Sequence, residues 1–413
     1  MAMKESGIEW VGLIPDTWSV IPNKYVMHKE KNLCEKWTGE DVMSLTMNGV
    51  IVRDLQNPTG KMPATFDGYQ YIEDGDLLMC LFDIDVTPRC VGKVTHNGVT
   101  SPAYSNFKVH DNASRDYFYY YYLMVDNTKE LLHLAKNLRH SFTEEQLGQL
   151  KVPMPPLSEQ QAIADYLDET CSQIDEIIAE AKASIDEYKE LKQSVIFEAV
   201  TKGLDKNVEM KDSGVEWIGE IPVDWNIAKI NRVAWTTSGA TPLRSKETEY
   251  YDNAVIRWVR TLDLNNGHVT DSSEKITETA LKNSSCSIMP VKTVCVAMYG
   301  GSGTIGKSGI LEVECATNQA ICSIVSDKKV LNPDYLHYVI MAVRKYWMKY
   351  AVGTRKDPNI NQQIIAQMRI PIPQLSKQDI IVNHLDKVTD KCDSLISEKE
   401  SLINDLEAYK KCC

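Results

Sequence analysis

Residues 152–168 read VPMPPLSEQQAIADYLD, and residues 370–386 read IPIPQLSKQDIIVNHLD, so one segment occurs twice at an offset of 218 positions. In both copies prolines hold the entering chain extended, and the residues after them have the pattern of a helix. Ser158 and Ser376 stand where a side chain caps the free amides of a first helical turn. The repeated segment therefore predicts two related helices, and these helices decide the fold.

A narrow apolar stripe continues from each copy, with steps that alternate between four and three residues. In the first copy the stripe consists of Leu167, Cys171, Ile174, Ile178, Ala181, Ile185, Tyr188 and Val195. The second copy keeps the phase with Leu385, Cys392, Ile396, Ile403 and Leu406. The stripes are interrupted by Lys192, Thr389, Lys399 and Lys410. Such spacing is typical of a coiled coil.

The first helix has no Gly or Pro from position 157 to position 202, and Gly203 supplies its end. It should therefore span about 45 residues, or roughly 66 Å at a rise of 1.5 Å per residue. Two helices with matching stripes can bury them against each other, and an antiparallel pair would set the flanking units at opposite ends of a rod. When either helix is considered by itself, the alternative is that its apolar stripe is buried in a separate core.

A second segment is also duplicated, in the same order along the chain. Residues 3–18 (MKESGIEWVGLIPDTW) return as residues 210–225 (MKDSGVEWIGEIPVDW), at an offset of 207. The stretches between the shared segments, residues 19–151 and 226–369, hardly resemble each other over most of their length. Both contain short alternating or β-branched runs punctuated by Gly, Asn and Asp, which indicates β-rich units.

These patterns predict an α+β fold in which two β-rich units are separated by a long antiparallel two-helix coiled coil, with an internal pseudo-twofold duplication. The expected divisions are a first unit with its shared segment at 1–151, a central helix at 152–209, a second unit at 210–369 and a final helix at 370–413. Each unit ends in helical sequence rich in aromatic residues, at 117–122 and 335–340, and we expect those rings to pack rather than to stack on bases.

The composition is that of an ordinary globular protein, with 43% hydrophobic and 25% charged residues. No signal-like N-terminus and no apolar stretch of membrane-spanning length occurs, so we expect a cytoplasmic protein with no membrane partner. The 11 cysteines include no C-x-x-C pair, and no histidine cluster has ligand spacing. The sequence therefore indicates no metal site, no disulfide framework and no cofactor.

The net charge of −12 is unevenly distributed. Residues 152–209 carry 5 Lys/Arg against 13 Asp/Glu, whereas residues 227–369 carry 18 against 12. An acidic helix repels phosphate, while the second unit has cations available for it. The first unit makes a weaker electrostatic case, with 14 against 17 in residues 19–151.

The repeats resemble those of the specificity subunit (S, HsdS) of type I restriction-modification systems, over essentially the whole chain. The shared segments that carry the resemblance lie at 155–160, 201–225 and 373–378. In the second unit the matching segments are SGATPLR (238–244), VIRWVRTLDLNNG (255–267) and ATNQAI (316–321), which resemble the common target-recognition domain. In the first unit NGVTSPAY (97–104) resembles a second class of that domain.

The resemblance implies a non-catalytic subunit that binds a bipartite double-stranded DNA target through two target-recognition domains, one half-site each. Its helices would bind two modification subunits, which methylate adenine, and the assembly would recruit two motor-nuclease subunits. A free-standing DNA-binding adaptor with the same architecture is an alternative.

Candidate DNA contacts are the basic residues near the matched segments, because an Arg fork reads guanine bidentately and Lys mostly meets phosphate. In the second unit they are Arg244, Arg257, Arg260, Lys307, Arg355 and Lys356. In the first unit they are Arg89, Lys93 and Arg139, with the Gly92-Lys93 pair as a counterpart of the glycine-rich turn before Lys307. A single exposed Arg is often only solvated or salt-bridged. DNA contact is therefore predicted for the set of basic residues and not for each residue separately.

Two motifs suggest enzymes instead. Residues 301–308 (GSGTIGKS) match the phosphate-binding loop G-x-x-x-x-G-K-S, which makes an NTP-binding enzyme the main rival hypothesis. Such a loop must lead into a helix, but residues 308–315 have the pattern of a strand. Residues 332–335 (NPDY) partly match an amino-methyltransferase motif but lack its second proline. We therefore favour DNA binding over both enzyme classes.

Overall fold

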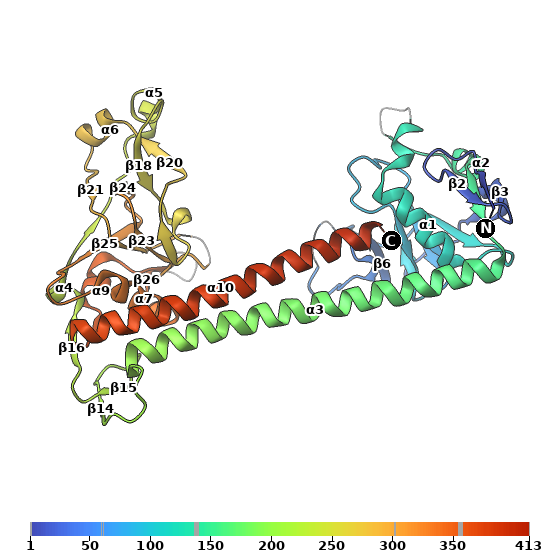
Figure 1. Ribbon diagram of the computed structural model, residues 1–413. Helices are drawn as coiled ribbons and strands as arrows, with labels where there is room; N and C mark the ends of the chain where they lie inside the picture. Colours follow the sequence, from blue (N-terminus) through green and yellow to red (C-terminus); the bar gives the residue numbers. More distant parts are fainter. Residues whose placement is uncertain are drawn as a thin grey trace. The chain divides into compact units, whose positions relative to one another are not determined.

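Two long helices, α3 (Leu157–Lys202) and α10 (Leu375–Cys412), each contribute to two structural units (Figure 1). The computed structural model describes residues 2–58, 60, 62–135, 140–300, 303–353 and 358–412. Unit 1 comprises Met1–Ala181 with Ser401–Cys413, and unit 2 comprises Lys182–Glu400. The mixture of helix and strand in both units and the two long helices confirm the predicted fold class.

The two long helices pair, as the apolar stripes predict. In unit 1, Lys410 Nζ lies 2.5 Å from Asp175 Oδ1, and in unit 2, Lys192 Nζ lies 2.6 Å from Asp393 Oδ2. The pairing is antiparallel, because residue numbers rise along α3 as they fall along α10. The offset of 218 relates Asp175 to Asp393 and Lys192 to Lys410, so the two ion pairs are one contact repeated. Stripe positions buried along the helices include Ile174, Ile178, Ala181, Ile185, Cys392 and Ile403.

The ends of α3 follow local signals, with one correction to the predicted cap. The helix has 46 residues and ends at Gly203, whose φ is +77° and whose N–H donates to the Ala199 carbonyl. At the other end the helix begins at Leu157, so Ser158 lies inside the first turn and does not cap it. The same holds for Ser376, because α10 begins at Leu375. Prolines upstream extend the chain only up to the first helical residue.

Unit 1 contains two sheets and a set of short helices. A hairpin pairs β1 (Met3–Glu5) with β2 (Leu13–Pro15), and β3 (Ser19–Pro22) pairs with β13 (Lys151–Met154). One sheet has the order β10 (Val91–Lys93), β9 (Leu77–Met79), β12 (Ser105–Val109) and β4 (Met27–Glu30). The other has the order β5 (Leu33–Cys34), β8 (Tyr69–Ile72), β11 (Gly98–Thr100), β6 (Val42–Thr46) and β7 (Gly49–Val52). The helices are η1 (Asn23–Tyr25), α1 (Arg115–Asn127), η2 (Glu130–His133) and α2 (Glu144–Gln149).

Unit 2 repeats this plan. Its hairpin is β14 (Met210–Asp212) with β15 (Glu220–Pro222), and β16 (Asn226–Lys229) pairs with β28 (Arg369–Ile372). One sheet has the order β17 (Ala234–Ser238), β25 (Ile321–Ser326), β22 (Val294–Ala297), β23 (Ser308–Leu311) and β19 (Gly267–Val269). The other has the order β20 (Glu274–Ile276), β18 (Ile256–Val259), β24 (Cys315–Thr317) and β21 (Ile288–Met289). A small pair, β26 (Val352–Gly353) and β27 (Pro358–Asn359), completes the strands.

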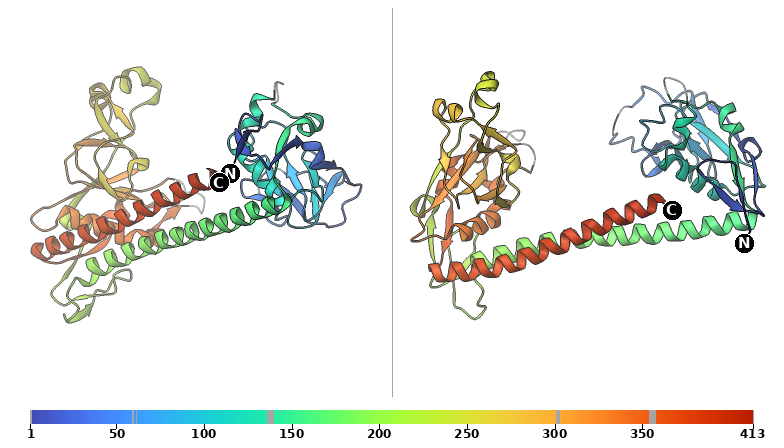
Figure 2. Two further views of the ribbon diagram at one scale, coloured as in Figure 1. Left: turned by 45° about the vertical axis from the view of Figure 1, so that its right-hand side comes forward. Right: turned by 45° about the horizontal axis from the view of Figure 1, so that its top comes forward.

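Unit 2 contains several helices besides α3 and α10 (Figures 1 and 2). They are α4 (Ile230–Val233), η3 (Arg244–Lys246), α5 (Glu247–Tyr250), η4 (Thr261–Asp263), α6 (Glu278–Asn283), α7 (Pro333–Val343), η5 (Arg344–Tyr346), α8 (Trp347–Tyr350) and α9 (Gln362–Gln367). Within this unit α7 lies beside α10, while α5 and α6 lie beyond the four-stranded sheet, on the side away from α10. No helix among the described residues is long and apolar enough to cross a membrane.

The two units share a strand topology although their sequences are unlike, except that the edge strands β5 in unit 1 and β19 in unit 2 have no counterpart. In unit 1, β11 runs parallel to β6 and antiparallel to β8, and in unit 2, β24 runs parallel to β18 and antiparallel to β21. The central ladders also agree, because β9 lies between β10 and β12 just as β22 lies between β23 and β25. Strand pairing requires only a suitable alternation of buried residues, so unlike sequences can adopt one topology.

The same polar contacts attach α1 and α7 to the long helices. Gln160 Oε1 accepts from the N–H of Ser114, the residue before α1, and Gln378 Oε1 accepts from the N–H of Asn332, the residue before α7, each at 2.8 Å. About two turns further along the long helices, Tyr120 donates to Asp168 at 2.7 Å and Tyr338 donates to Asp386 at 2.6 Å. All four contacts obey the offset of 218, so the repeat includes α1 and α7 as well as the long helices.

Candidate nucleic-acid interface

The loop 238–244 in unit 2, SGATPLR, is held tightly against the rest of its unit. Gly239 approaches β24 so closely that a Cβ there would lie 1.9 Å from the carbonyl oxygen of Thr317. The next residue, Ala240, donates its N–H to that same oxygen at 3.0 Å, and its own carbonyl accepts from Trp258 Nε1 at 3.0 Å. Only glycine allows this approach, so the loop has a fixed position from which it presents Arg244.

Arg244 and Arg260 meet on a single carboxylate. Glu274 Oε2 lies 2.5 Å from Nη2 of Arg244, and Glu274 Oε1 lies 3.3 Å from Nη1 of Arg260. The Arg244 guanidinium also lies over the Tyr251 ring, 4.3 Å from its centroid, where a cation–π attraction adds to the ion pair. The hydrogen bond to Glu274 raises the pKa of Arg244 above its ordinary value. The structure thus brings together two of the predicted DNA contacts.

Arg257 points to the other face of the sheet. Successive residues of a strand alternate between faces, so Trp258 in β18 lies on the Arg244 side while its neighbour Arg257 does not. Arg257 Nε donates to Asp271 Oδ1 at 2.9 Å. The backbone N–H of Ser272 and the Arg257 side chain together lower the pKa of Asp271. The three arginines therefore form two separate sites, each with a carboxylate partner.

The turn after β18 fixes the backbone that carries Arg260. Asp263 Oδ2 accepts from the Arg260 N–H at 2.7 Å, and its Oδ1 accepts from the Ser273 N–H at 3.0 Å, so one carboxylate joins the turn to the residues before β20. The side chain of Arg260 donates from Nη2 to Ser273 Oγ at 3.0 Å. Its Nε is buried and has no hydrogen-bond partner among the described residues. Arg260 is consequently ordered at both its backbone and its side chain.

In unit 1 the structure brings together Arg89 and Lys93. Both cations lie over the Tyr119 ring, at 5.9 Å for Arg89 Cζ and 5.2 Å for Lys93 Nζ. Arg89 donates to the Met47 carbonyl at 2.8 Å, to the Val91 carbonyl at 3.0 Å and to the Tyr119 hydroxyl at 2.5 Å. These bonds join the hairpin β6–β7 to β10 and α1, so several Arg89 donors already serve the fold.

Lys93 is engaged by two carboxylates. Its Nζ lies 3.1 Å from Asp116 Oδ1 and 3.3 Å from Asp168 Oδ1. Burial works to raise the pKa of Asp116, but Arg115 and Lys93 outweigh it and the pKa falls below its ordinary value. Lys93, Arg89, Asp168 and Lys410 line one groove of about 510 Å³ with mixed charge. A phosphate in this groove would have to displace existing ion pairs.

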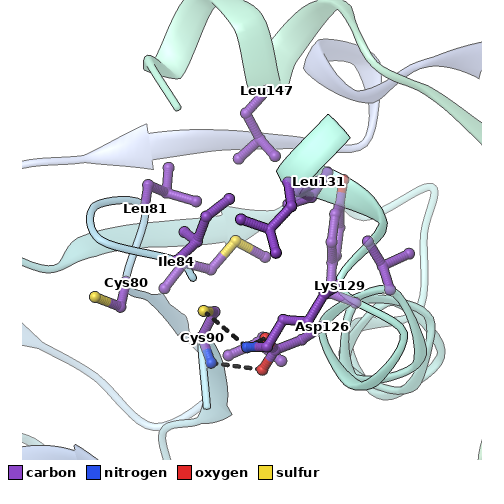
Figure 3. Close-up of a pocket in the computed structure, with 13 residues that line it drawn as sticks. Cys80, Leu81, Ile84, Cys90, Asp126, Lys129, Leu131 and Leu147 are labelled. Atoms are coloured by element: carbon purple, nitrogen blue, oxygen red, sulfur yellow. Dashed lines mark hydrogen bonds and ion pairs between the residues drawn. The ribbon is translucent and has the colours of Figure 1, made fainter. Parts of the chain in front are cut away.

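An ion pair between the buried Asp126 and the half-buried Lys129 holds the loop that leads to Arg89 (Figure 3). Asp126 accepts from the Cys90 N–H at 2.5 Å and from Lys129 Nζ at 2.8 Å, and Lys129 also donates to the Thr87 carbonyl at 2.9 Å. Apolar side chains such as Leu81, Ile84, Leu131 and Leu147 surround the pair. Burial raises the pKa of the Cys90 thiol, so this cysteine is an inert packing residue.

Residues 301 and 302 of the predicted phosphate-binding loop lie outside the described residues, and residues 303–307 form a tight turn that leads into a strand. A Cβ on Gly306 would lie 2.2 Å from the Trp347 ring, and Ser308 begins β23. A phosphate-binding loop needs a helix at that point, so the local structure does not fit the NTP-binding hypothesis. The strand registers of the two units also show which positions are equivalent. Gly92 in β10 is equivalent to Gly309 in β23, so Lys93 is equivalent to Ile310 and not to Lys307. Lys307 and Lys93 are therefore not counterparts, contrary to the sequence prediction.

The structure also bears on the remaining predicted contacts, on the NPDY motif and on metal binding. Arg139, Arg355 and Lys356 lie outside the described residues. Asn332 caps α7, because its Oδ1 accepts from the N–H groups of Asp334 and Tyr335, and this explains the NPDY segment without methyl transfer. Within the described ranges, no group of three or more His, Cys, Asp or Glu residues could hold a metal ion.

Sequence reasoning missed the acidic partners, above all Glu274 and Asp263. Both lie within the resembling segment or shortly after it, but their role depends on strand pairing. Glu274 faces Trp258 across the β18–β20 ladder, a register that no local motif reveals. The available signal was the interleaving of acids and arginines between positions 257 and 274, which is unusual for a purely phosphate-binding surface.

Comparison with known proteins now identifies the family. The chain belongs to the type I restriction modification DNA specificity domain family, whose model matches residues 84–187 and 222–405. A similar curated protein is the type I restriction enzyme MjaVIII specificity subunit of Methanocaldococcus jannaschii, 25% identical over 63% of this chain and 60% of that protein. Another is the EcoBI specificity subunit of Escherichia coli, 24% identical over 69% of this chain and 61% of that protein. The match thus spans less than two thirds of these relatives.

Solved structures agree on the fold. A chain from a study of complex assembly and conformational transition of the type I R-M system has a TM-score of 0.71 at 13% identity, with 97% of both chains covered. The HsdS subunit from Thermoanaerobacter tengcongensis has a TM-score of 0.56 at 14% identity, with 97% of this chain and 96% of that chain covered. The family resemblance predicted from the repeats is confirmed.

Proposed function

We propose that this chain is the DNA-sequence-specificity subunit of a type I restriction-modification complex and that each of its units reads one half of a bipartite target. The observation that carries the proposal is the shared topology of two units with unlike sequences, attached to α3 and α10 by the same contacts. One scaffold with two different surfaces suits a target whose halves differ in sequence. In unit 2 the surface in question includes Arg244 and Arg260.

In this proposal the chain supplies recognition and its partners supply the chemistry. Two modification subunits that methylate adenine would bind the paired helices, and two motor-nuclease subunits would join the assembly. The acidic helix α3 favours a protein partner over DNA, because its excess of Asp and Glu repels phosphate. Direct DNA contact is accordingly assigned to the units, where Arg and Lys are concentrated near the matched segments.

The proposal is tested by mapping methylated adenines in the host genome with and without this gene. We expect one bipartite motif, two short specific sequences around an unspecified gap, to lose methylation when the gene is deleted. An unchanged methylation pattern would contradict the proposal and would favour a free-standing DNA-binding adaptor. The purified chain should not hydrolyse ATP, and turnover that Lys307→Ala abolishes would favour the NTP-binding alternative.

A further inference from the structure

Glu274 has an unusual position for a carboxylate near a DNA-binding surface, because it contacts two candidate reading arginines at once. Its two oxygens bind different partners, Oε2 the Nη2 of Arg244 and Oε1 the Nη1 of Arg260. The side chains remain accessible, with exposed fractions of 31% for Glu274, 48% for Arg244 and 27% for Arg260. A surface built only for phosphate would gain affinity by omitting this acid.

We propose that Glu274 is a positioning residue that sets the base specificity of unit 2 by holding the guanidinium groups of Arg244 and Arg260 in one orientation. The proposal rests on the proposed function and deepens it, because it names the residue that makes the arginines selective. Glu274 acts through the arginines and is not itself required to touch DNA.

The contacts of Glu274 and its neighbours fix the two guanidinium groups in place. An Arg side chain loses up to about 2 kcal/mol of rotamer entropy when it is fixed, and a guanidinium that is already fixed avoids that loss on binding. Arg244 is fixed from two directions, by Glu274 and by the Tyr251 ring, whose hydroxyl in turn donates to the Pro242 carbonyl at 2.7 Å. Arg260 is fixed by Glu274 and by Ser273 Oγ. Both forks are therefore oriented before DNA arrives.

The Glu274 carboxylate also lowers the positive charge of the arginine pair. Two unpartnered guanidinium groups would attract any phosphate and would bind DNA of every sequence. With Glu274 between them the local charge falls from +2 to +1, and the carboxylate repels a phosphate that approaches the pair. A guanine edge carries no net charge and offers two acceptors to an arginine fork, so it suffers much less from this repulsion. Glu274 therefore disfavours non-specific DNA more than it disfavours the correct base pair.

Both guanidinium groups keep N–H groups that the protein does not use. Arg260 contacts Glu274 through Nη1 and Ser273 through Nη2, and each of these nitrogens carries a second N–H. Its Nε is buried and lies out of reach of DNA. The Arg244 contact to Glu274 uses Nη2, and the fork retains further N–H groups on a side chain that is 48% exposed. The protein therefore orients both arginines and still leaves some of their N–H groups available to DNA.

The test uses the complete chain in complex with its methyltransferase subunits, because the isolated units have not been shown to fold. Glu274→Gln keeps the shape and removes the charge, Glu274→Asp keeps the charge on a shorter arm, and Glu278→Gln is the matched control. Glu278 lies four residues further along the chain in α6, where it pairs with Lys282 of the same helix at 3.6 Å and has 73% of its side chain exposed. Thermal unfolding verifies that all variants are folded.

Binding is measured at several salt concentrations to the mapped target, to targets with single base-pair changes in either half-site, and to unrelated duplex DNA. For Glu274→Gln we expect discrimination to fall by about tenfold at one or more positions of the unit 2 half-site and to stay unchanged in the other half. Binding to unrelated DNA should be as tight or tighter, with a steeper salt dependence. Glu274→Asp should recover part of the lost discrimination, and Glu278→Gln should match the unaltered chain.

Arg244→Ala, made alone and with Glu274→Gln, adds an independent measurement. If Glu274 acts through Arg244, the two changes should lower discrimination together by less than the product of their separate effects. The inference is wrong if Glu274→Gln leaves every position unchanged, if it weakens specific and unrelated DNA equally, or if the two changes act independently. If instead the unaltered complex prefers no bipartite target, the proposed function itself fails, and the inference fails with it.

Discussion

At the scale of single residues, three arginines of unit 2 near the matched segments are bound by carboxylates of their own unit. Arg244 and Arg260 share Glu274, and Arg257 is held by Asp271 on the opposite face of the sheet. The sequence predicted the arginines because a guanidinium fork suits guanine and phosphate, whatever the fold. It did not predict their partners, because these depend on the antiparallel register of β18 and β20, which sequence patterns leave open.

Gly239→Ala tests the close packing of the loop that carries Arg244. The new Cβ would lie 1.9 Å from the Thr317 carbonyl oxygen, so the loop or β24 must move, and we expect unit 2 to lose about 2 kcal/mol or more of stability. Gly267→Ala is the control, because a Cβ there meets nothing within 4 Å. Denaturant unfolding of the two variants is compared, and equal stability would show that Gly239 is not confined by its neighbours.

His337 predicts a pH dependence of stability. Burial, together with the positive charges of His268, Lys292 and Lys192, lowers the pKa of His337 from 6.5 to about 3. Between these values the unfolded chain binds a proton that the folded chain excludes, so stability is lost as the pH falls below 6.5. The loss approaches about 1.4 kcal/mol for each pH unit, until the folded-state pKa is reached.

His337→Leu removes the titrating ring and should flatten the pH dependence of unfolding between pH 6.5 and pH 4.5, even if it changes the stability at neutral pH. The comparison uses the slope of unfolding free energy against pH in the two proteins. Parallel slopes would mean that His337 does not remain neutral in the folded state.

At the scale of elements, the long helix α3 was predicted over its full span because its boundaries are local signals. Prolines precede Leu157, and Gly203 terminates the helix with a positive φ that other residues rarely adopt. The predicted serine caps were wrong by two residues, because α3 begins directly after Pro156 and α10 begins directly after Gln374. The attachments of α1 and α7 were not predicted, because a tyrosine hydroxyl and a distant aspartate show no spacing that distinguishes them from packing residues.

The paired helices should also set the gap between half-sites. Adding seven residues near Ala183 in α3 and seven near Leu402 in α10 keeps the heptad phase and both ion pairs, and lengthens the pair by about 10 Å. Since DNA rises 3.4 Å per base pair, the preferred gap should grow by about three base pairs with unchanged half-sites. Methylated-motif mapping measures the gap, and an active complex with an unchanged gap would refute the role of the helices.

The matched control is the same insertion in α3 alone. It increases the separation of Asp175 and Lys192 along one helix, while the separation of Asp393 and Lys410 along the other stays the same. Both ion pairs cannot then form in one register. We expect this variant to methylate poorly, whereas the variant with both insertions stays active.

At the scale of the whole molecule, the duplication was readable from the sequence but its extent was not. Self-comparison found the shared helices and hairpins, because their residues recur at fixed offsets. The intervening units have diverged in sequence while β11 and β24 keep the same parallel and antiparallel neighbours. A strand topology is kept by any substitution that preserves the alternation of buried and exposed residues. Two units with unlike sequences can therefore have the same strand topology. Unlike units on a common scaffold support the proposal that each unit reads its own half of a target.

The most direct test of this account replaces residues 226–369 with the corresponding unit of a relative and maps methylated adenines in cells that carry the hybrid chain. The hybrid keeps α3, α10 and unit 1, so the complex should assemble and methylate. The account predicts a new bipartite motif in which one half-site changes while the other half-site is retained. An active hybrid that alters both half-sites, or neither, would contradict the claim that each unit reads its own half of the target.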